Sequence, residues 1–292
     1  MYKRQVQNTS NNNNSSSGYV SQISLENYSD TAVYAANKIL PSIVGIKVEY
    51  TVNNPMLSMF GQSSNSTATA TGSGIIISED GYILTNNHVI STDSSSSSNS
   101  SYQISEANKI TVTLFNDTTE YEATIVGKDE ETDLAVIKID KTDLPKAEFA
   151  DSDSIKVGEF AMAVGNPMGM DSTVTCGIVS AVNREVTDSE GNTFTLIQTD
   201  AAINAGNSGG ALVNSEGKVI GINTLKLEGT GIEGLGFAIP INSTTDITSQ
   251  LIEYSKVKRP YIGLTGMDLD EETAEKNNLV PGVYVKSIED FS

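Results

Sequence analysis

The segment Thr199-Asp200-Ala201-Ala202-Ile203-Asn204-Ala205-Gly206-Asn207-Ser208-Gly209-Gly210 surrounds one serine with glycines and leads directly into the apolar residues 211–213. A serine on a tight glycine-rich turn can expose its hydroxyl, and the free backbone N–H groups of the turn can converge on one point. Acyl transfer needs this combination of a nucleophile and an oxyanion hole. Taken alone, the segment leaves open a glycine-rich hairpin with an incidental serine.

Gly206 to Gly210 also match the G-x-S-x-G turn of α/β-hydrolases, in which a helix follows the serine and the histidine comes later in the chain. No histidine follows Ser208, and residues 211–213 are typical of a strand. The segment therefore excludes that fold.

Short segments rich in β-branched residues fall into two groups of about six, divided near residues 145–155, and no helix alternates with them. This pattern predicts an all-β protein with two β-barrels, barrel one over about 40–145 and barrel two over about 146–240. The expected strands are 43–50, 74–77, 82–85, 110–114, 121–126, 134–139, 160–164, 174–182, 194–198, 211–213, 219–225 and 236–239.

Two helices flank the strands in this prediction. One short helix is expected from the N-caps Ser29 and Asp30 to Pro41, and another over 244–255 after Ser243 as its cap. Three polar stretches interrupt the pattern. Residues 1–24 are expected to form a disordered arm, and residues 51–71 and 91–107 two mobile surface loops.

Composition excludes several classes of protein. The net charge of −19 disfavours nucleic-acid binding, because such a charge repels phosphate. One cysteine, Cys176, excludes an internal disulfide framework and a cysteine-rich zinc site, and one histidine excludes multi-histidine metal centres. We expect neither a metal nor a cofactor. No apolar run reaches the roughly 18–20 residues of a membrane span, and no signal-peptide core is visible.

Any imidazole chemistry must use His88, which follows the expected strand 82–85, and Asp133 stands just before the strand 134–139. Each residue alone has a bland interpretation, as a packed or surface histidine and as a turn aspartate. With Ser208 they follow the chain order His, Asp, Ser, which is that of the two-barrel serine proteases. This order places the active site in the cleft between the barrels.

At this point the chain resembles the HtrA/Deg family of trypsin-like serine proteases over about residues 28–292. The motifs that carry the resemblance occur in the family's order. They are Gly72-Ser73-Gly74-Ile75-Ile76-Ile77, Thr85-Asn86-Asn87-His88-Val89, Thr132-Asp133-Leu134-Ala135-Val136, Val164-Gly165-Asn166-Pro167 with Gly177-Ile178-Val179-Ser180, Gln198 through Gly210, and Gly236-Phe237-Ala238-Ile239-Pro240. Ala205 and Ala211 depart from the family, which commonly has proline at both positions.

The resemblance assigns roles to the site. Ser208 attacks the scissile carbonyl, His88 accepts its proton, and Asp133 holds the imidazole tautomer. The N–H groups of Gly206 and Ser208, helped by Asn207, bind the oxyanion. We expect activity to fall as acid protonates His88.

Substrate recognition follows from the same resemblance. Digestive relatives that cut after basic residues have an acid six positions before the nucleophile, where this chain has Ala202. With Ile203 beside it, a small apolar S1 pocket is expected. Thr224, Leu225 and Lys226 resemble the edge that pairs with substrate, with ordinary barrel packing as the alternative.

The end of the chain resembles the start of a PDZ domain. Residues 256–260 are the expected linker and 261–292 an incomplete PDZ domain, in which Tyr261, Ile262, Gly263 and Leu264 match the carboxylate-binding loop. A full module needs roughly 80–100 residues, so little or no peptide binding is expected from this piece.

As a whole, the resemblance implies a serine endopeptidase that cleaves unfolded proteins in quality control and stress response. It implies a homotrimer built through the N-terminal region, an extracytoplasmic site at the bacterial cell surface, and an anchor upstream of this chain. It also implies loops, at about Arg184–Thr193 and Leu225–Leu235, that switch the oxyanion hole between formed and collapsed states. A chaperone-like scaffold with a silent protease site is the alternative.

Overall fold

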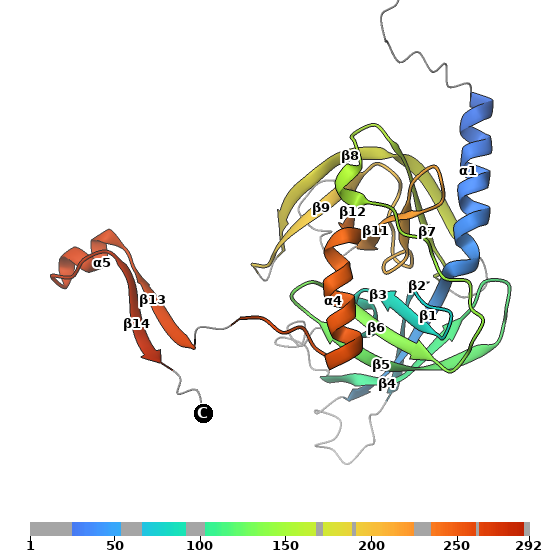
Figure 1. Cartoon of the computed structure of the whole chain (residues 1–292). Helices are drawn as coiled ribbons and strands as arrows, with labels where there is room; N and C mark the ends of the chain where they lie inside the picture. The colour runs from blue at the N-terminus through green and yellow to red at the C-terminus, as the bar shows by residue number, and fades with distance from the viewer. Residues whose placement is uncertain are drawn as a thin grey trace, which may run out of the picture.

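Two closed, six-stranded antiparallel barrels make up most of the molecule, which confirms the predicted double β-barrel (Figure 1). The computed structural model describes residues 25–53, 66–91, 103–167, 172–188, 191–224, 235–260 and 263–288. Barrel one has the order β1-β2-β3-β6-β5-β4 and barrel two the order β10-β11-β12-β9-β8-β7. The strands are β1 (Ile43–Asn53), β2 (Ser66–Ile76), β3 (Tyr82–Thr85), β4 (Gln103–Thr113), β5 (Glu120–Asp129), β6 (Leu134–Ile139), β7 (Phe160–Gly165), β8 (Thr173–Thr187), β9 (Thr193–Thr199), β10 (Ala211–Val213), β11 (Val219–Thr224) and β12 (Gly236–Pro240).

Barrel-one strands reach further than their apolar pattern indicated. β1 and β2 pair as far as Val52 opposite Ser66, and β4 already begins at Gln103. The expected loops 51–71 and 91–107 are therefore shorter than predicted. At these strand ends polar residues pair, such as Thr51 with Thr67. Backbone hydrogen bonds can extend a strand pair there, although the side chains form no apolar face. The rest of both expected loops, like the expected arm 1–24, lies outside the described residues.

The helix bounds also differ from the prediction. α1 (Leu25–Ile39) contains Ser29 and Asp30, which are exposed within it and do not cap it, and the short 3-10 helix η1 (Leu40–Ser42) follows. α4 (Ile241–Tyr254) begins after Pro240. Ser243 does not cap this helix, because its hydroxyl donates to the Pro240 carbonyl at 2.7 Å. Among the described residues, no helix is long and apolar enough to cross a membrane.

A two-stranded unit follows α4 and stands apart from the barrels in Figure 1. It consists of β13 (Leu264–Leu269), α5 (Glu271–Lys276) and β14 (Gly282–Ile288), with the strands antiparallel. Its apolar side chains include Val280, Val283 and Ile288, which are exposed. Leu269 and Ala274 are buried within the unit, and its assignment to a PDZ domain stays a prediction.

One hydrophobic core joins the two barrels and both flanking helices. It contains Leu84 and Leu134 of barrel one together with Met162 and Leu196 of barrel two, and Leu251 of α4 packs into the same cluster. Separate clusters fill the interior of each barrel. Because the barrels share a core, the loops at their junction are held at one place.

Replacement of Leu251 by Ala tests this shared core. The side chain is fully buried, so the substitution should lower the free energy of unfolding by about 2–4 kcal/mol, from lost burial and the cavity left behind. Ile252→Ala is the matched control, because Ile252 is partly exposed on the same helix and should cost less than about 1 kcal/mol. Urea unfolding of both variants measures the difference, and equal losses would contradict the shared core.

Candidate active site

His88 lies on the single turn α3 (Asn87–Ile90), directly after β3 in barrel one. The start of this turn is tied to the backbone of Asp133. The amide of Asn87 donates to the Asp133 carbonyl at 3.1 Å, and the side-chain amide of Asn86 donates to the same carbonyl at 3.0 Å. The two segments that carry the histidine and the aspartate are therefore fastened to each other before their side chains meet.

The Asp133 carboxylate is almost fully buried and accepts three kinds of donor. His88 Nδ1 lies 2.8 Å from Oδ2, the His88 backbone N–H donates to Oδ1 at 3.0 Å, and the Thr224 hydroxyl donates to Oδ2 at 3.2 Å. An ionised carboxylate only accepts hydrogen bonds, so Nδ1 carries the imidazole proton. Nε2 is thereby left as the nitrogen that can accept a proton.

Thr224, which the sequence predicts to lie on the substrate edge, makes a further contact in the structure. Thr224 is the last residue of β11 in barrel two and is buried. Its hydroxyl donates a hydrogen bond to Asp133 of barrel one. Sequence reasoning missed this contact, because 91 residues separate the partners and no local pattern links them.

Ser208 lies in the loop between β9 and β10 and is buried. The next residue, Gly209, donates its N–H to the Asn223 carbonyl at 2.9 Å and has a φ of +78°. A Cβ at this glycine would stand 2.3 Å from the Thr85 hydroxyl and 3.3 Å from the backbone nitrogen of Asn86. The loop that carries Ser208 thus packs against the end of β3, just before His88, at the junction of the barrels.

Asn207 supports the serine loop from within. Its backbone N–H donates to the Asn204 carbonyl at 3.1 Å, its side-chain oxygen accepts from the Asn204 N–H at 3.0 Å, and its side-chain amide donates to the Ala202 carbonyl at 3.1 Å. These hydrogen bonds shape the loop that carries Ser208, and the help of Asn207 in binding the oxyanion stays a prediction.

The predicted substrate-binding residues divide into three groups. Ala202 is exposed beside the serine loop, and Ile203 is buried next to Gly236 at the start of β12. Thr224 faces the aspartate, as described above. Leu225 and Lys226 lie outside the described residues, as do Tyr261 and Ile262 of the predicted carboxylate loop. Gly263, with a φ of +67°, directly precedes β13, and Leu264 is the first residue of that strand.

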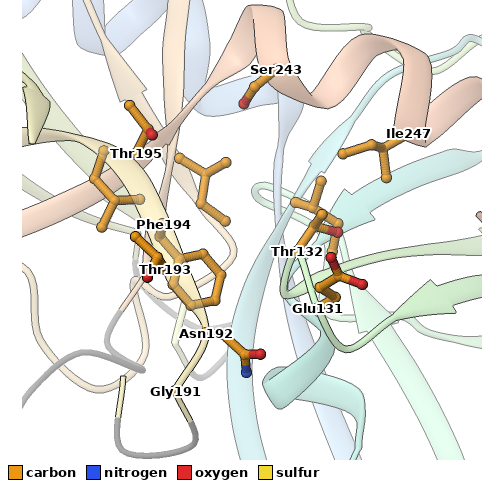
Figure 2. A pocket seen from close by; sticks show the side chains of 12 residues that line it. Glu131, Thr132, Gly191, Asn192, Thr193, Phe194, Thr195, Ser243 and Ile247 are labelled. Atoms are coloured by element: carbon orange, nitrogen blue, oxygen red, sulfur yellow. The ribbon is translucent and has the colours of Figure 1, made fainter. Parts of the chain in front are cut away.

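A cavity of about 450 Å³ lies beside the turn that carries Asp133, between that turn, the β8–β9 hairpin and α4 (Figure 2). It shares its walls with the aspartate turn but is lined by neither His88 nor Ser208. Its lining residues are Glu131, Thr132, Leu134, Gly191, Asn192, Thr193, Phe194, Thr195, Leu196, Ile239, Ser243 and Ile247.

An ion-pair clamp holds the other end of the aspartate turn. The Arg259 guanidinium, in the segment after α4, makes two hydrogen bonds of 2.7 Å to Asp129, and its Nε lies 2.8 Å from Glu131. Asp129 in turn accepts from the N–H and the hydroxyl of Thr132, at 3.1 and 2.6 Å. The expected linker thus contributes a side chain to the turn that ends at Asp133, and nothing in the linker sequence indicated it.

The charge on Asp129 depends on these partners. Burial raises the pKa of its carboxyl, but the hydrogen bonds from Arg259 and Thr132 outweigh burial and hold the pKa below its ordinary value. A carboxyl whose pKa is lowered by folding contributes stability above its unfolded pKa, and that stability is lost as the pH falls through the lowered value.

Known proteins are similar to this chain in both fold and sequence. The family description "Trypsin-like peptidase domain" matches residues 72–222. The serine protease Do-like HtrB of Bacillus subtilis is 39% identical over 92% of this chain and 61% of its own length. The periplasmic serine endoprotease DegP of Escherichia coli is 39% identical over 86% of this chain and 58% of its own length. This chain therefore spans little more than half of either relative.

The solved structures give the same result. The HtrA-type protease AlgW with a decapeptide superposes with a TM-score of 0.65 at 34% identity, covering 88% of this chain and 79% of AlgW.

Arg259→Ala should destabilise the protein at neutral pH and have less effect in acid. The variant leaves Asp129 buried without its cation, so its pKa should rise, and the stability gap to the wild type should close as the pH falls below about 4. Thermal unfolding between about pH 3 and 7 measures the gap. Lys146→Ala, which breaks an exposed pair with Glu79, is the control and should have little effect at any pH. An effect of Arg259→Ala that is independent of pH would contradict the prediction.

Proposed function

The chain belongs to the trypsin-like peptidases of the HtrA/Deg serine protease family, and from this membership we propose that it is a serine endopeptidase that cuts unfolded or misfolded proteins. The observation that carries the proposal is the His88–Asp133 pair, in which Nδ1 lies 2.8 Å from the buried carboxylate, beside the packed loop of Ser208. A scaffold without hydrolytic activity has no need for these three groups at one junction.

In the proposed mechanism, the Ser208 hydroxyl attacks the scissile carbonyl while Nε2 of His88 takes its proton. Asp133 holds the imidazole by Nδ1 and stabilises the imidazolium that forms. The same imidazolium then gives its proton to the leaving amine. Water enters, His88 deprotonates it, and the acyl-enzyme is hydrolysed at Ser208.

The oxyanion of the tetrahedral intermediate is placed on the N–H groups of Gly206 and Ser208. Asn207 acts through its hydrogen bonds to Asn204 and Ala202, which hold the turn between those two groups. The loops near 184–193 and 225–235 are the segments through which this hole would be switched between formed and collapsed states.

We propose a small apolar S1 pocket with Ala202 and Ile203 in its wall, suited to Val or Ala in the substrate. The absence of an acid at Ala202 supports this choice, because a cationic side chain would find no partner there. Leu225 and Lys226 are the proposed continuation of the substrate edge beyond Thr224.

For the whole protein, we propose residues 25–255 as the protease domain, 256–260 as the linker and 261–292 as part of a PDZ domain. The relatives named periplasmic support an extracytoplasmic location and a role in quality control under stress. The exposed Tyr28, Val33 and Tyr34 on α1 support a homotrimer built through this helix, with a membrane anchor as a further part of the intact protein. Sedimentation equilibrium would show a monomer if the trimer proposal is wrong.

Cleavage of reduced casein tests the proposed function. The chain should degrade casein, with Val or Ala at the newly formed carboxyl ends, and Ser208→Ala should abolish the cleavage because it removes the nucleophile. Ser249→Ala is the control, since Ser249 lies exposed on α4 and should leave the rate unchanged. Casein that is held in solution but not cut by the wild type would favour the chaperone-like scaffold instead.

The rate of cleavage should also fall on the acid side of neutrality. A protonated imidazole cannot accept the Ser208 proton. Initial rates on a short peptide taken from a casein cleavage site, measured between about pH 5 and 8, show this limb. A flat profile over that range would argue against a histidine base.

A further inference from the structure

Ser73 of β2 is a barrel-one residue whose polar groups reach the serine loop of barrel two. It lies in the middle part of the strand, opposite Gly45 of β1, and is completely buried. The motif around it contributed to the family resemblance, but neither the sequence nor the mechanism above assigns Ser73 a role.

Three hydrogen bonds join Ser73 to barrel two. Its backbone N–H donates to the carbonyl of Ser208 at 2.9 Å, and its hydroxyl donates to the carbonyl of Gly206 at 2.6 Å. The hydroxyl also accepts the N–H of Asn166 at 2.7 Å. A hydroxyl has one proton to donate. Because the Ser73 hydroxyl gives this proton to Gly206 and accepts from Asn166 on a lone pair, the two hydrogen bonds fix its orientation.

The surroundings leave room for this hydroxyl and for little else. A Cβ at Gly165 would stand 2.8 Å from the Ser73 hydroxyl oxygen and 2.5 Å from Cα of Asn207. The carbonyl of Ser73 accepts the Thr85 hydroxyl at 2.7 Å, which fixes the residue from its own barrel. Ser73 is therefore held by hydrogen bonds from both barrels, and the loop that carries Ser208 packs against it.

The two carbonyls that Ser73 holds belong to the peptides on either side of the one that carries the Ser208 N–H. Peptide units are planar, so fixing the Gly206 and Ser208 carbonyls restricts the rotation of the peptide between them. The remaining contacts of Asn207 with Asn204 restrict it from the other side. The direction of the Ser208 N–H is thus set largely from barrel one.

We propose that Ser73 is a positioning residue for oxyanion stabilisation. Its hydroxyl holds the Gly206 carbonyl away from the reacting carbonyl and keeps the loop in the shape in which the N–H groups of Gly206 and Ser208 can share one oxyanion. This inference rests on the proposed function, because it concerns the transition state of that reaction. In this proposal Ser73 contacts no substrate atom and acts only through the loop that carries Ser208.

The test compares Ser73→Ala with Ser152→Ala in hydrolysis of the short casein-derived peptide. Ser152 is a matched control, because it is also a buried serine of the described chain whose hydroxyl accepts a backbone N–H, that of Asn242, at 3.1 Å. Ser73→Ala should lower kcat by about 10- to 100-fold with KM changed less than about threefold. Ser152→Ala should leave both constants within about twofold of the wild type.

Inhibition by a peptidyl boronic acid is the second measurement. The inhibitor has, next to its boron atom, the residue after which the casein-derived peptide is cut. Its anionic tetrahedral adduct with a serine places a boronate oxygen where the oxyanion forms, so its inhibition constant should rise in Ser73→Ala by about the same factor as kcat falls. A merely structural role would lower the melting temperature and leave the boronate affinity of the folded enzyme unchanged. That result would overturn the proposal, as would a wild-type kcat in Ser73→Ala.

Two further outcomes are informative. If Ser73→Ala does not fold, Ser73→Cys keeps a side-chain donor, although a weaker and larger one, and should show a loss of kcat in the same direction, whereas a wild-type kcat in Ser73→Cys would overturn the proposal. A wild-type chain that cleaves neither casein nor the peptide would overturn the proposed function and the role of Ser73 with it. An active wild type beside an unaffected Ser73→Ala would overturn the role of Ser73 alone.

Discussion

The hydrophobic core shared by the two barrels is the constraint on which the rest of the structure depends. The three proposed catalytic groups come from different segments, two in barrel one and one in barrel two, and only a fixed junction can hold them together. Leu84 and Leu134 flank the segments that carry His88 and Asp133, and both belong to the cluster that also contains Met162 and Leu196 of barrel two. Burial of this apolar surface stabilises the junction, and the hydrogen bonds across it then set the positions of polar groups.

Those hydrogen bonds solve the problem of a buried carboxylate. Removing the charge of Asp133 from water is costly unless donors replace the lost hydration. The donors come from both barrels, with the backbone and ring of His88 on one side and the hydroxyl of Thr224 on the other. The same contacts that compensate the charge also orient the imidazole. Stability and the proposed catalysis therefore make the same demand on this part of the molecule.

Much of the fold could be predicted from the sequence, because strands with apolar faces have a local pattern. The two groups of six strands and their division follow from that pattern, whereas the polar ends of β1, β2 and β4 do not, since backbone pairing does not require an apolar side chain. The predicted helix starts were wrong. Ser29 and Ser243 are of a residue type that often caps helices, but both lie inside a helix, since α1 begins at Leu25 and α4 at Ile241.

The candidate site shows the same limit. His88, Asp133 and Ser208 could be proposed because their residue types and order are distinctive. The partners that hold them, Thr224, Ser73 and Arg259, are ordinary polar residues whose roles depend on contacts between segments far apart in the chain. A single sequence contains no signal for such contacts. The cavity beside the aspartate turn could not be foreseen either, since it is formed by three separate elements.

The central claim is that the junction of the two barrels makes one serine nucleophilic. Reaction of the folded chain with a fluorophosphonate, followed by mass spectrometry of its peptides, tests this claim most directly, because the reagent modifies an activated serine without needing a recognised substrate. The account predicts one label per chain, located on Ser208, and loss of that label in Asp133→Asn and after unfolding. Absence of labelling, or labels spread over several serines, would contradict it.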